Sequence, residues 1–213
     1  AHKFGGKVMV AFVFEDNMKA LKGIMDVPIL SWASMASSAS EIRDSLVSSK
    51  PIPFEKVVYY ANLVAEQTSL SRLTFGWYMY KSNFKGNLPW SYYYLHLNWM
   101  PFNVDDFPYD TAFYAYPTQD KPIPTLKFEA AREGVNDLRY LEYVEVLLKN
   151  CKDKKKVNNC QKKLNTMLAE ISLTNDRGNQ SSNYLFPPQR LDQFRHVLQD
   201  MVLTLTSSDN QIK

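Results

Sequence analysis

Short apolar segments alternate with amphipathic ones in the first half of the chain. Short apolar runs rich in β-branched or aromatic residues predict buried strands. Four such runs occur, at residues 7–14, 27–32, 55–63 and 86–94. Between them, apolar residues recur at the spacing of a helix, most clearly at residues 69–83. Strand and helix therefore alternate, which predicts an α/β fold built from parallel βα units.

Four βα units fit more than one architecture. They can form a small doubly wound sheet, or half of a (β/α)8 TIM-like barrel, whose full length is about 250 residues. No glycine-rich phosphate loop follows any of the strands, which argues against a nucleotide-binding sheet. A free-standing four-stranded domain is a third possibility, and its open strand edges would then need the C-terminal helices as a cover.

The second half of the chain has a helical pattern throughout. Three helices are predicted, at residues 125–151, 160–173 and 187–208. The Pro187-Pro188 pair suits the start of the last helix. We therefore expect a barrel part at 1–148 and a helical extension at 149–213.

Composition narrows the class of protein. The chain has 213 residues, with 45% hydrophobic and 22% charged residues and a net charge of +3. This charge is too small to indicate a nucleic-acid partner, and we expect Lys152 and 154–156 to lie in a solvated loop. No apolar run reaches the ~18 residues of a membrane span. No group of residues has metal-ligand spacing, so no cofactor is expected.

The two cysteines bear on the cellular compartment. Cys151 and Cys160 flank a polar stretch between two helical patterns. A disulfide that closes this helical hairpin is one expectation, and two free thiols are the alternative. A disulfide, together with the glycosylation sequon at Asn179, would indicate a secreted or cell-surface protein.

The segment at residues 86–117 is dense in tyrosine and tryptophan. Aromatic rings stack on the flat faces of sugars, and phenol or amide groups can bond their hydroxyls. The alternative is that many of these rings pack a core, with their polar ends bonded. In a barrel, function gathers where strands end. Residues near predicted strand ends or in the loop after the fourth strand are therefore the candidate contacts to a carbohydrate: Trp32, Tyr60, Asn62, Trp90, Tyr92, Tyr93 and Tyr116.

Glu15 and Asp16 are the weak candidates for catalysis in this chain. They are adjacent carboxylates at the end of the first strand, where barrel enzymes place their chemistry. Acidic residues at this position also suit the N-terminus of the following helix, because they complement its dipole. We favour the second interpretation.

Three stretches of the chain resemble a known family. They are "LKGIMDVPILSW" at 21–32, "LTFGWYMYKSNFKGNLPWSYY" at 73–93 and "KPIPTLKFEAAREGVNDLRYLEYVE" at 121–145. Together they resemble the C-terminal half of glycoside hydrolases of family 123 and relatives of the DUF4091 type. The residues of the third stretch that match the family motif are Pro122, Pro124, Thr125, Lys127, Glu129, Ala130, Arg132, Glu133, Gly134, Asp137, Tyr140 and Leu141.

The resemblance implies the C-terminal half of a (β/α)8 barrel that acts on a β-linked N-acetylgalactosaminide. It implies an Asp-Glu pair at the end of the fourth barrel strand, which we expect upstream of Ala1. The chain would then supply the aromatic wall of the sugar site, with the N-terminal half of the barrel as its partner. A non-catalytic carbohydrate-binding, surface or assembly protein on the same barrel is the alternative.

The charged residues of the third stretch have a structural interpretation. We expect Glu129, Arg132, Glu133 and Asp137 to be local neighbours on a helix that they hold against the barrel. Lys127 stands where the family more often has arginine, which weakens any bidentate role at that position.

Overall fold

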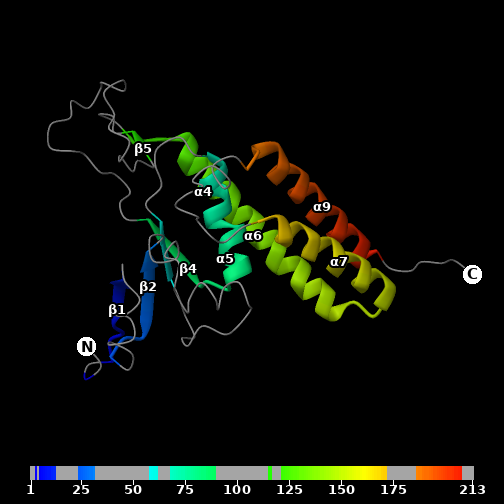
Figure 1. Cartoon of the computed structure of the whole chain (residues 1–213), viewed down its shortest axis with the longest axis horizontal. Coiled ribbons are helices and arrows are strands. Elements are labelled where there is room, and N and C mark those ends of the chain that lie inside the picture. Colours follow the sequence, from blue (N-terminus) through cyan, green and yellow to red (C-terminus); the bar gives the residue numbers. More distant parts are fainter. Residues whose placement is uncertain are drawn as a thin grey trace, which may run out of the picture.

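The computed structural model describes residues 3, 5–12, 24–31, 58–61, 68–89, 115–116, 121–171 and 186–207. Six strands lie within these residues: β1 Met9–Phe12, β2 Val27–Ser31, β3 Val58–Ala61, β4 Gly86–Pro89, β5 Ala115–Tyr116 and β6 Ile123–Pro124. The described helices are α4 Thr68–Phe75, α5 Trp77–Ser82, α6 Leu126–Asn150, α7 Lys154–Glu170 and α9 Pro188–Thr206. Figure 1 shows the strands at one end of the molecule and the long helices extending away from them.

The first four strands form one parallel sheet in the order β1-β2-β3-β4. Each strand thus lies next to its neighbour in the sequence. This confirms the four predicted strands and the α/β character of the fold. β5 and β6 form a separate antiparallel pair just before α6.

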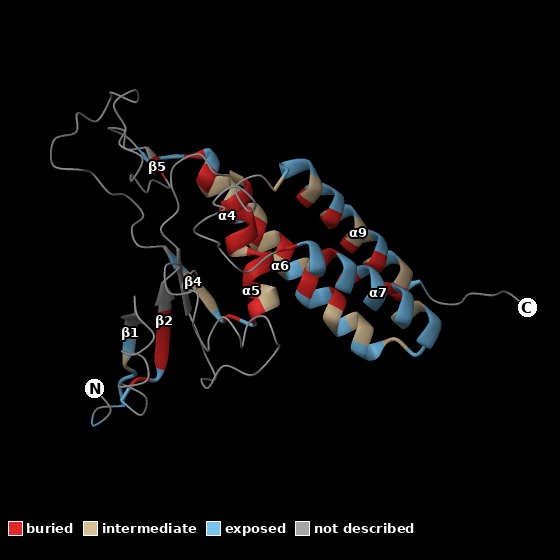
Figure 2. Cartoon of the chain, viewed as in Figure 1, coloured by how far each residue is buried: buried red, intermediate tan, exposed pale blue. Residues whose placement is uncertain are grey.

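α4 is buried on all sides, because it lies between the sheet and the outer helices (Figure 2). Its polar residues are bonded within the protein. The hydroxyl of Ser71 donates to the carbonyl of Lys127 at 3.1 Å, and that of Thr74 donates to the carbonyl of Leu70 at 2.7 Å. A helix this enclosed can carry serine and threonine only where their hydroxyls find such partners.

The single helix predicted at 69–83 is divided into α4 and α5 at Gly76, so that prediction was wrong in this detail. Gly76 has φ −122° and ψ −84°, outside the helical range. A Cβ atom at Gly76 would lie 2.5 Å from the carbonyl oxygen of Gly134 on α6, and one at Gly134 would lie 2.5 Å from that of Arg72. The two glycines therefore allow α6 to approach the α4–α5 break closely.

α6 and α7 begin at side-chain caps. The Thr125 hydroxyl accepts from the amide of Phe128 at 3.2 Å, and the Asp153 carboxylate accepts from the amides of Lys155 and Lys156. The cap at Asp153 starts α7 six residues before the predicted position at Cys160.

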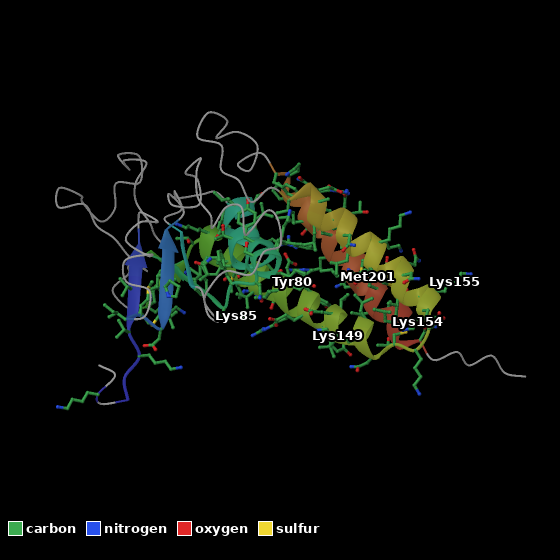
Figure 3. The ribbon with its side chains drawn as sticks, turned by 60° about the horizontal axis from the view of Figure 1, so that its bottom comes forward. Tyr80, Lys85, Lys149, Lys154, Lys155 and Met201 are labelled. Atoms are coloured by element: carbon green, nitrogen blue, oxygen red, sulfur yellow. The ribbon has the colours of Figure 1, made fainter. Side chains whose placement is uncertain are left out.

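The lysines at 154–156 therefore form the first turn of α7, and the expectation of a loop there was wrong. They lie at the end of the helical layer that is farther from the sheet, together with Lys149, as the labelled Lys149, Lys154 and Lys155 show (Figure 3). Lys152 precedes the helix and is exposed. Lys156 also donates to the carbonyl of Ser207 at 3.1 Å, which joins the start of α7 to the end of α9.

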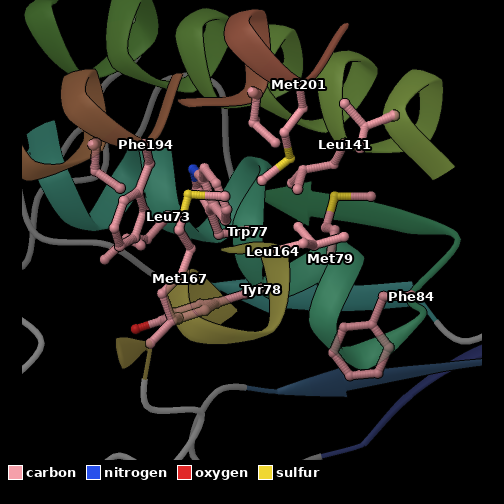
Figure 4. Close-up of a cluster of buried hydrophobic side chains, with 14 of the residues drawn as sticks. Leu73, Trp77, Tyr78, Met79, Phe84, Leu141, Leu164, Met167, Phe194 and Met201 are labelled. Atoms are coloured by element: carbon pink, nitrogen blue, oxygen red, sulfur yellow. The ribbon is translucent and has the colours of Figure 1, made fainter. Parts of the chain in front are cut away.

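One hydrophobic cluster runs through all five described helices. Trp77, Leu141 and Phe194 are at most 1% exposed, and the ring centroids of Trp77 and Phe194 are 5.1 Å apart (Figure 4). α7 and α9 pack on the same core as α4 to α6, and α6 continues unbroken past residue 148. The helices after residue 148 therefore share the interior of those before it.

The contact at the two glycines leads to a prediction. Gly134→Ala adds a methyl group against the backbone of α4, so we expect the free energy of unfolding to fall by about 1–3 kcal/mol. In an open helix position the same change would stabilise by up to about 1 kcal/mol. Urea denaturation measures the effect, and Glu142→Ala on the exposed face of α6 is the control. Unchanged or raised stability of Gly134→Ala would show that the helices do not meet so closely.

Candidate functional site

The carboxyl ends of the parallel strands meet at one edge of the sheet. Ser31, Tyr60 and Leu88 pair in one row across β2, β3 and β4. The described strands end at this row or within one residue of it. Binding and catalytic residues of such sheets gather at this edge.

The start of α6 lies at the same edge. α4 follows β3 and runs back along the sheet, since Asn87 near the start of β4 donates to the carbonyl of Thr74 near the end of α4, at 3.4 Å. α6 runs alongside α4 in the same direction. Ser71 bonds to Lys127 near the start of α6, and Gly76, just after α4, lies against Gly134 further along α6. The first turn of α6 is therefore next to the first turn of α4, at the carboxyl edge.

The β5–β6 pair leads directly into α6. Tyr116 pairs with Ile123, and Pro124 is followed by the helix cap Thr125. This hairpin lies at the same end of the molecule as the carboxyl edge (Figure 1). The motif that resembles the family thus connects the aromatic segment to a helix whose position is set by its contacts with α4.

Most of the predicted site residues lie outside the described residues. Tyr60 is the third residue of β3, and Tyr116 ends β5. Whether the predicted contacts meet in one site stays a prediction. The others fall in undescribed segments: Trp32, Asn62, Trp90, Tyr92, Tyr93, Glu15, Asp16 and Asn179.

The most extensive polar arrangement among the described residues surrounds Asp137 on α6. This carboxylate is 0% exposed. Its Oδ2 accepts from Nε of Arg72 at 2.7 Å and from Nε1 of Trp77 at 3.1 Å. Its Oδ1 accepts from Nε of Arg195 at 2.7 Å. The donors come from α4, α5 and α9, so four helices converge on one carboxylate.

Two further acids complete this group, the Asp137 cluster, defined as Arg72, Trp77, Glu133, Asp137, Asp192 and Arg195. Arg72 donates to Asp192 at 2.5 Å, and Arg195 pairs with the carboxylate of Glu133. Burial works to lower the pKa of Arg72, but its hydrogen bonds to Asp137 and Asp192 outweigh it and raise that pKa. The hydrogen bond from Arg195 lowers the pKa of Glu133.

The Asp137 cluster brings two arginines and three acids together as ion pairs. Both oxygens of the buried carboxylate accept hydrogen bonds from charged or indole donors. A carboxylate with both oxygens occupied in this way has no free position for a substrate. We therefore assign the cluster to the assembly of the helices.

Sequence reasoning found these residues and their local pairs but missed their distant partners. The local pairs of Arg132 with Glu129, at 2.7 Å, and with Glu133, at 3.4 Å, are confirmed. Glu133 and Asp137 also pair with arginines 58 to 65 residues away. A signal was available, because Asp137 shares the helix face of Gly134 and Leu141, and an acid on a buried face needs a basic partner.

Lys127 is the most buried lysine of the described part, at 2% exposure. Burial lowers the pKa of its amine to about 8. It stands in the first turn of α6, at the carboxyl edge. The structure thus adds a buried basic residue to this end of the molecule, where the sequence indicated only a weakened bidentate contact.

The expected disulfide is absent, since Cys151 and Cys160 are both free thiols in the structure. Cys160 is buried in the hydrophobic cluster, and burial raises the pKa of its thiol. The expectation was wrong because α7 begins at Lys154 and incorporates Cys160 into its inward face.

The described residues offer neither a metal site nor a membrane span. No three His, Cys, Asp or Glu side chains among them form a group that could hold a metal ion. None of the helices in the described ranges is long and apolar enough to cross a membrane.

A sequential parallel sheet backed by helices defines an α/β domain. The sequence model of the glycoside hydrolase 123 catalytic domain matches residues 6–144. The chain belongs to this family, which confirms the resemblance and indicates a glycoside hydrolase. A search of curated proteins finds no match.

The Asp137 cluster leads to a prediction on stability. Asp137→Asn keeps the shape of the side chain but leaves Arg72 and Arg195 without their shared buried anion. We expect a loss of about 3–5 kcal/mol in the free energy of unfolding. Asp192→Asn removes an acid that is 61% exposed, and should cost less than about 1 kcal/mol. Urea denaturation of both variants checks this, and equal losses would contradict the assignment.

Lys127 leads to a prediction on pH. Between about pH 8 and pH 10.5 the unfolded chain keeps a proton that the folded lysine has released, so stability rises with pH. From about pH 7.5 to about pH 9.5, the wild type should gain about 2 kcal/mol relative to Lys127→Met. Denaturation at each pH measures this, with the exposed Lys162→Met as control. A constant difference between wild type and Lys127→Met would mean that the amine is solvated.

Proposed function

We propose that this chain is the C-terminal half of a glycoside hydrolase 123 barrel, and that it contributes the aromatic wall of a carbohydrate site. The observation that carries the proposal is the row of Ser31, Tyr60 and Leu88 across three parallel strands. Trp32, Asn62 and Trp90 follow β2, β3 and β4 immediately in the chain. Continued by one residue, the register brings Asn62 and Trp90 to one level on neighbouring strands, from which both can face one sugar chain.

Strand order supports the barrel. A doubly wound sheet reverses its strand order at the switch point, whereas barrel strands follow each other in sequence. The described sheet is sequential throughout. β1 and β4 each have one neighbour among the described strands, so both outer edges suit further barrel strands.

The face of the sheet opposite the helices supports the same interpretation. Val8 and Val10 pack against the helical cluster, so Met9 between them faces the other way. The register of the four strands places Leu88 on the same face of the sheet as Met9. Met9 is 53% exposed and Leu88 47% exposed. Apolar residues on this face suit the interior of a barrel, and we propose the N-terminal half of the barrel as the part that covers them.

The mechanism follows from the family. A Glu, supplied by the other half of the barrel, protonates the glycosidic oxygen as its bond to the anomeric carbon breaks. The acetamido oxygen of the substrate attacks that carbon, while an Asp orients the acetamido group. Water then opens the cyclic intermediate and restores the proton to the Glu. In this scheme, the residues of the present chain bind and orient the sugar by stacking and hydrogen bonds.

The proposal is tested with Trp90→Ala. We expect about a tenfold loss in kcat/KM for an aryl β-N-acetylgalactosaminide and a similar loss in affinity for N-acetylgalactosamine oligosaccharides, because a stacking ring is removed. Trp99→Ala, nine residues further along the same aromatic segment, is the matched control. The assay uses the native protein with both halves of the barrel.

Three outcomes decide the matter. Loss with Trp90→Ala alone supports the wall. Binding that depends on Trp90 without any hydrolysis would favour the non-catalytic carbohydrate-binding protein. Equal effects of both variants, or none, would overturn the placement of the site.

A further inference from the structure

A groove lies between α6 and α9, on the helical side of the molecule. Its volume is about 520 Å³, within the range of small-ligand sites. We call it the α6–α9 groove, and it is lined by Glu133, Asn136, Arg139, Tyr140, Tyr143, Arg195 and Gln199. α4 and α5 separate α6 from the sheet, so the groove is distinct from the carboxyl edge (Figure 1).

The groove has a fixed framework. Residues 136, 139, 140 and 143 follow the i, i+3, i+4, i+7 spacing, so they form one stripe along α6. Arg195 and Gln199 are one turn apart on α9 and face that stripe. Arg195 ties the two helices together, because it donates to Asp137 and to both the carboxylate and the carbonyl of Glu133. The two walls are therefore held at a set distance by the buried Asp137 cluster.

The lining has the chemistry of a saccharide site. Besides Arg195, which is already paired, the lining has two phenol rings, two side-chain amides, one guanidinium group and one carboxylate. Tyr143 is 48% exposed, so its ring is free to stack on a sugar face. The amide of Gln199 lies 3.5 Å from the hydroxyl of Tyr140, and Arg139 donates to the amide of Asn136 at 3.4 Å. These planar polar groups can bond pairs of ring hydroxyls.

The same lining disfavours other occupants. None of the residues that line the groove in the described part is aliphatic, so an amphipathic helix would find only the two phenol rings as apolar partners there. The charge of Arg195 is balanced by Asp137 and Glu133. Arg139 alone leaves too weak a field to select a polyanion.

We propose that the α6–α9 groove is an accessory binding site for neutral saccharides. Tyr143 stacks on one sugar ring, while Arg139, Asn136 and Gln199 bond its hydroxyls. The site holds a glycan chain on the helical side of the molecule and takes no part in bond cleavage. It stands independently of the aromatic wall at the carboxyl edge, because the two surfaces share no residue.

The test uses the native protein and two probes, N-acetylhexosamine tetrasaccharides in calorimetry and soluble galactomannan in affinity electrophoresis. We expect Tyr143→Ala to weaken binding of at least one probe about tenfold and Tyr143→Phe to retain it, because stacking needs the ring and not the hydroxyl. Arg139→Ala should weaken the same binding. Thermal unfolding confirms that each variant is folded.

The matched control is Val146→Ala, which alters an exposed apolar residue one turn beyond Tyr143 on α6. Saccharide binding should not respond to it, whereas docking of a protein through apolar contacts would. Binding that is absent in the wild type, or unaffected by Tyr143→Ala, overturns the accessory site. Trp90→Ala tests the other surface, so failure of one proposal is distinguishable from failure of the other.

Discussion

Asp137 carries a charge with no access to water, and the arrangement of the helices depends on it. A buried carboxylate is tolerated only when donors replace its hydration. Here the donors are Arg72, Trp77 and Arg195, each from a different helix. All three donors reach Asp137 only when the four helices pack in one particular arrangement. The cluster is therefore a strong determinant of how these helices pack.

The cluster acts on the candidate site through α6. This helix has 25 residues, and its contacts at Gly134 and Asp137 fix its position along α4 and α5. Its first turn, with Lys127, is thereby held at the carboxyl edge of the sheet. α9 supplies Arg195 from beyond the residues matched by the family, so the last described helix completes a cluster that the family domain contains only in part.

Much of the architecture could be predicted, because strand and helix patterns are local. The four parallel strands and the long helix at Leu126 follow from hydrophobic periodicity. The break at Gly76 could not be read in this way, since it depends on the approach of Gly134 from 58 residues away. The start of α7 at Lys154 was missed because the cap at Asp153 precedes a run of charges with no apolar pattern. The candidate site was predicted as positions at strand ends and stays a prediction, because most of those positions lie outside the described residues.

The sequence by itself determined the types of the main elements and the family, because a motif of some twenty residues with fixed spacing is specific and needs no knowledge of contacts. Only the tertiary structure decided which charges pair. Arg72 and Asp137 are 65 residues apart, and Arg195 is 58 residues beyond Asp137. Their meeting depends on how the helices pack, and periodicity along one helix holds no information about the partner that faces it.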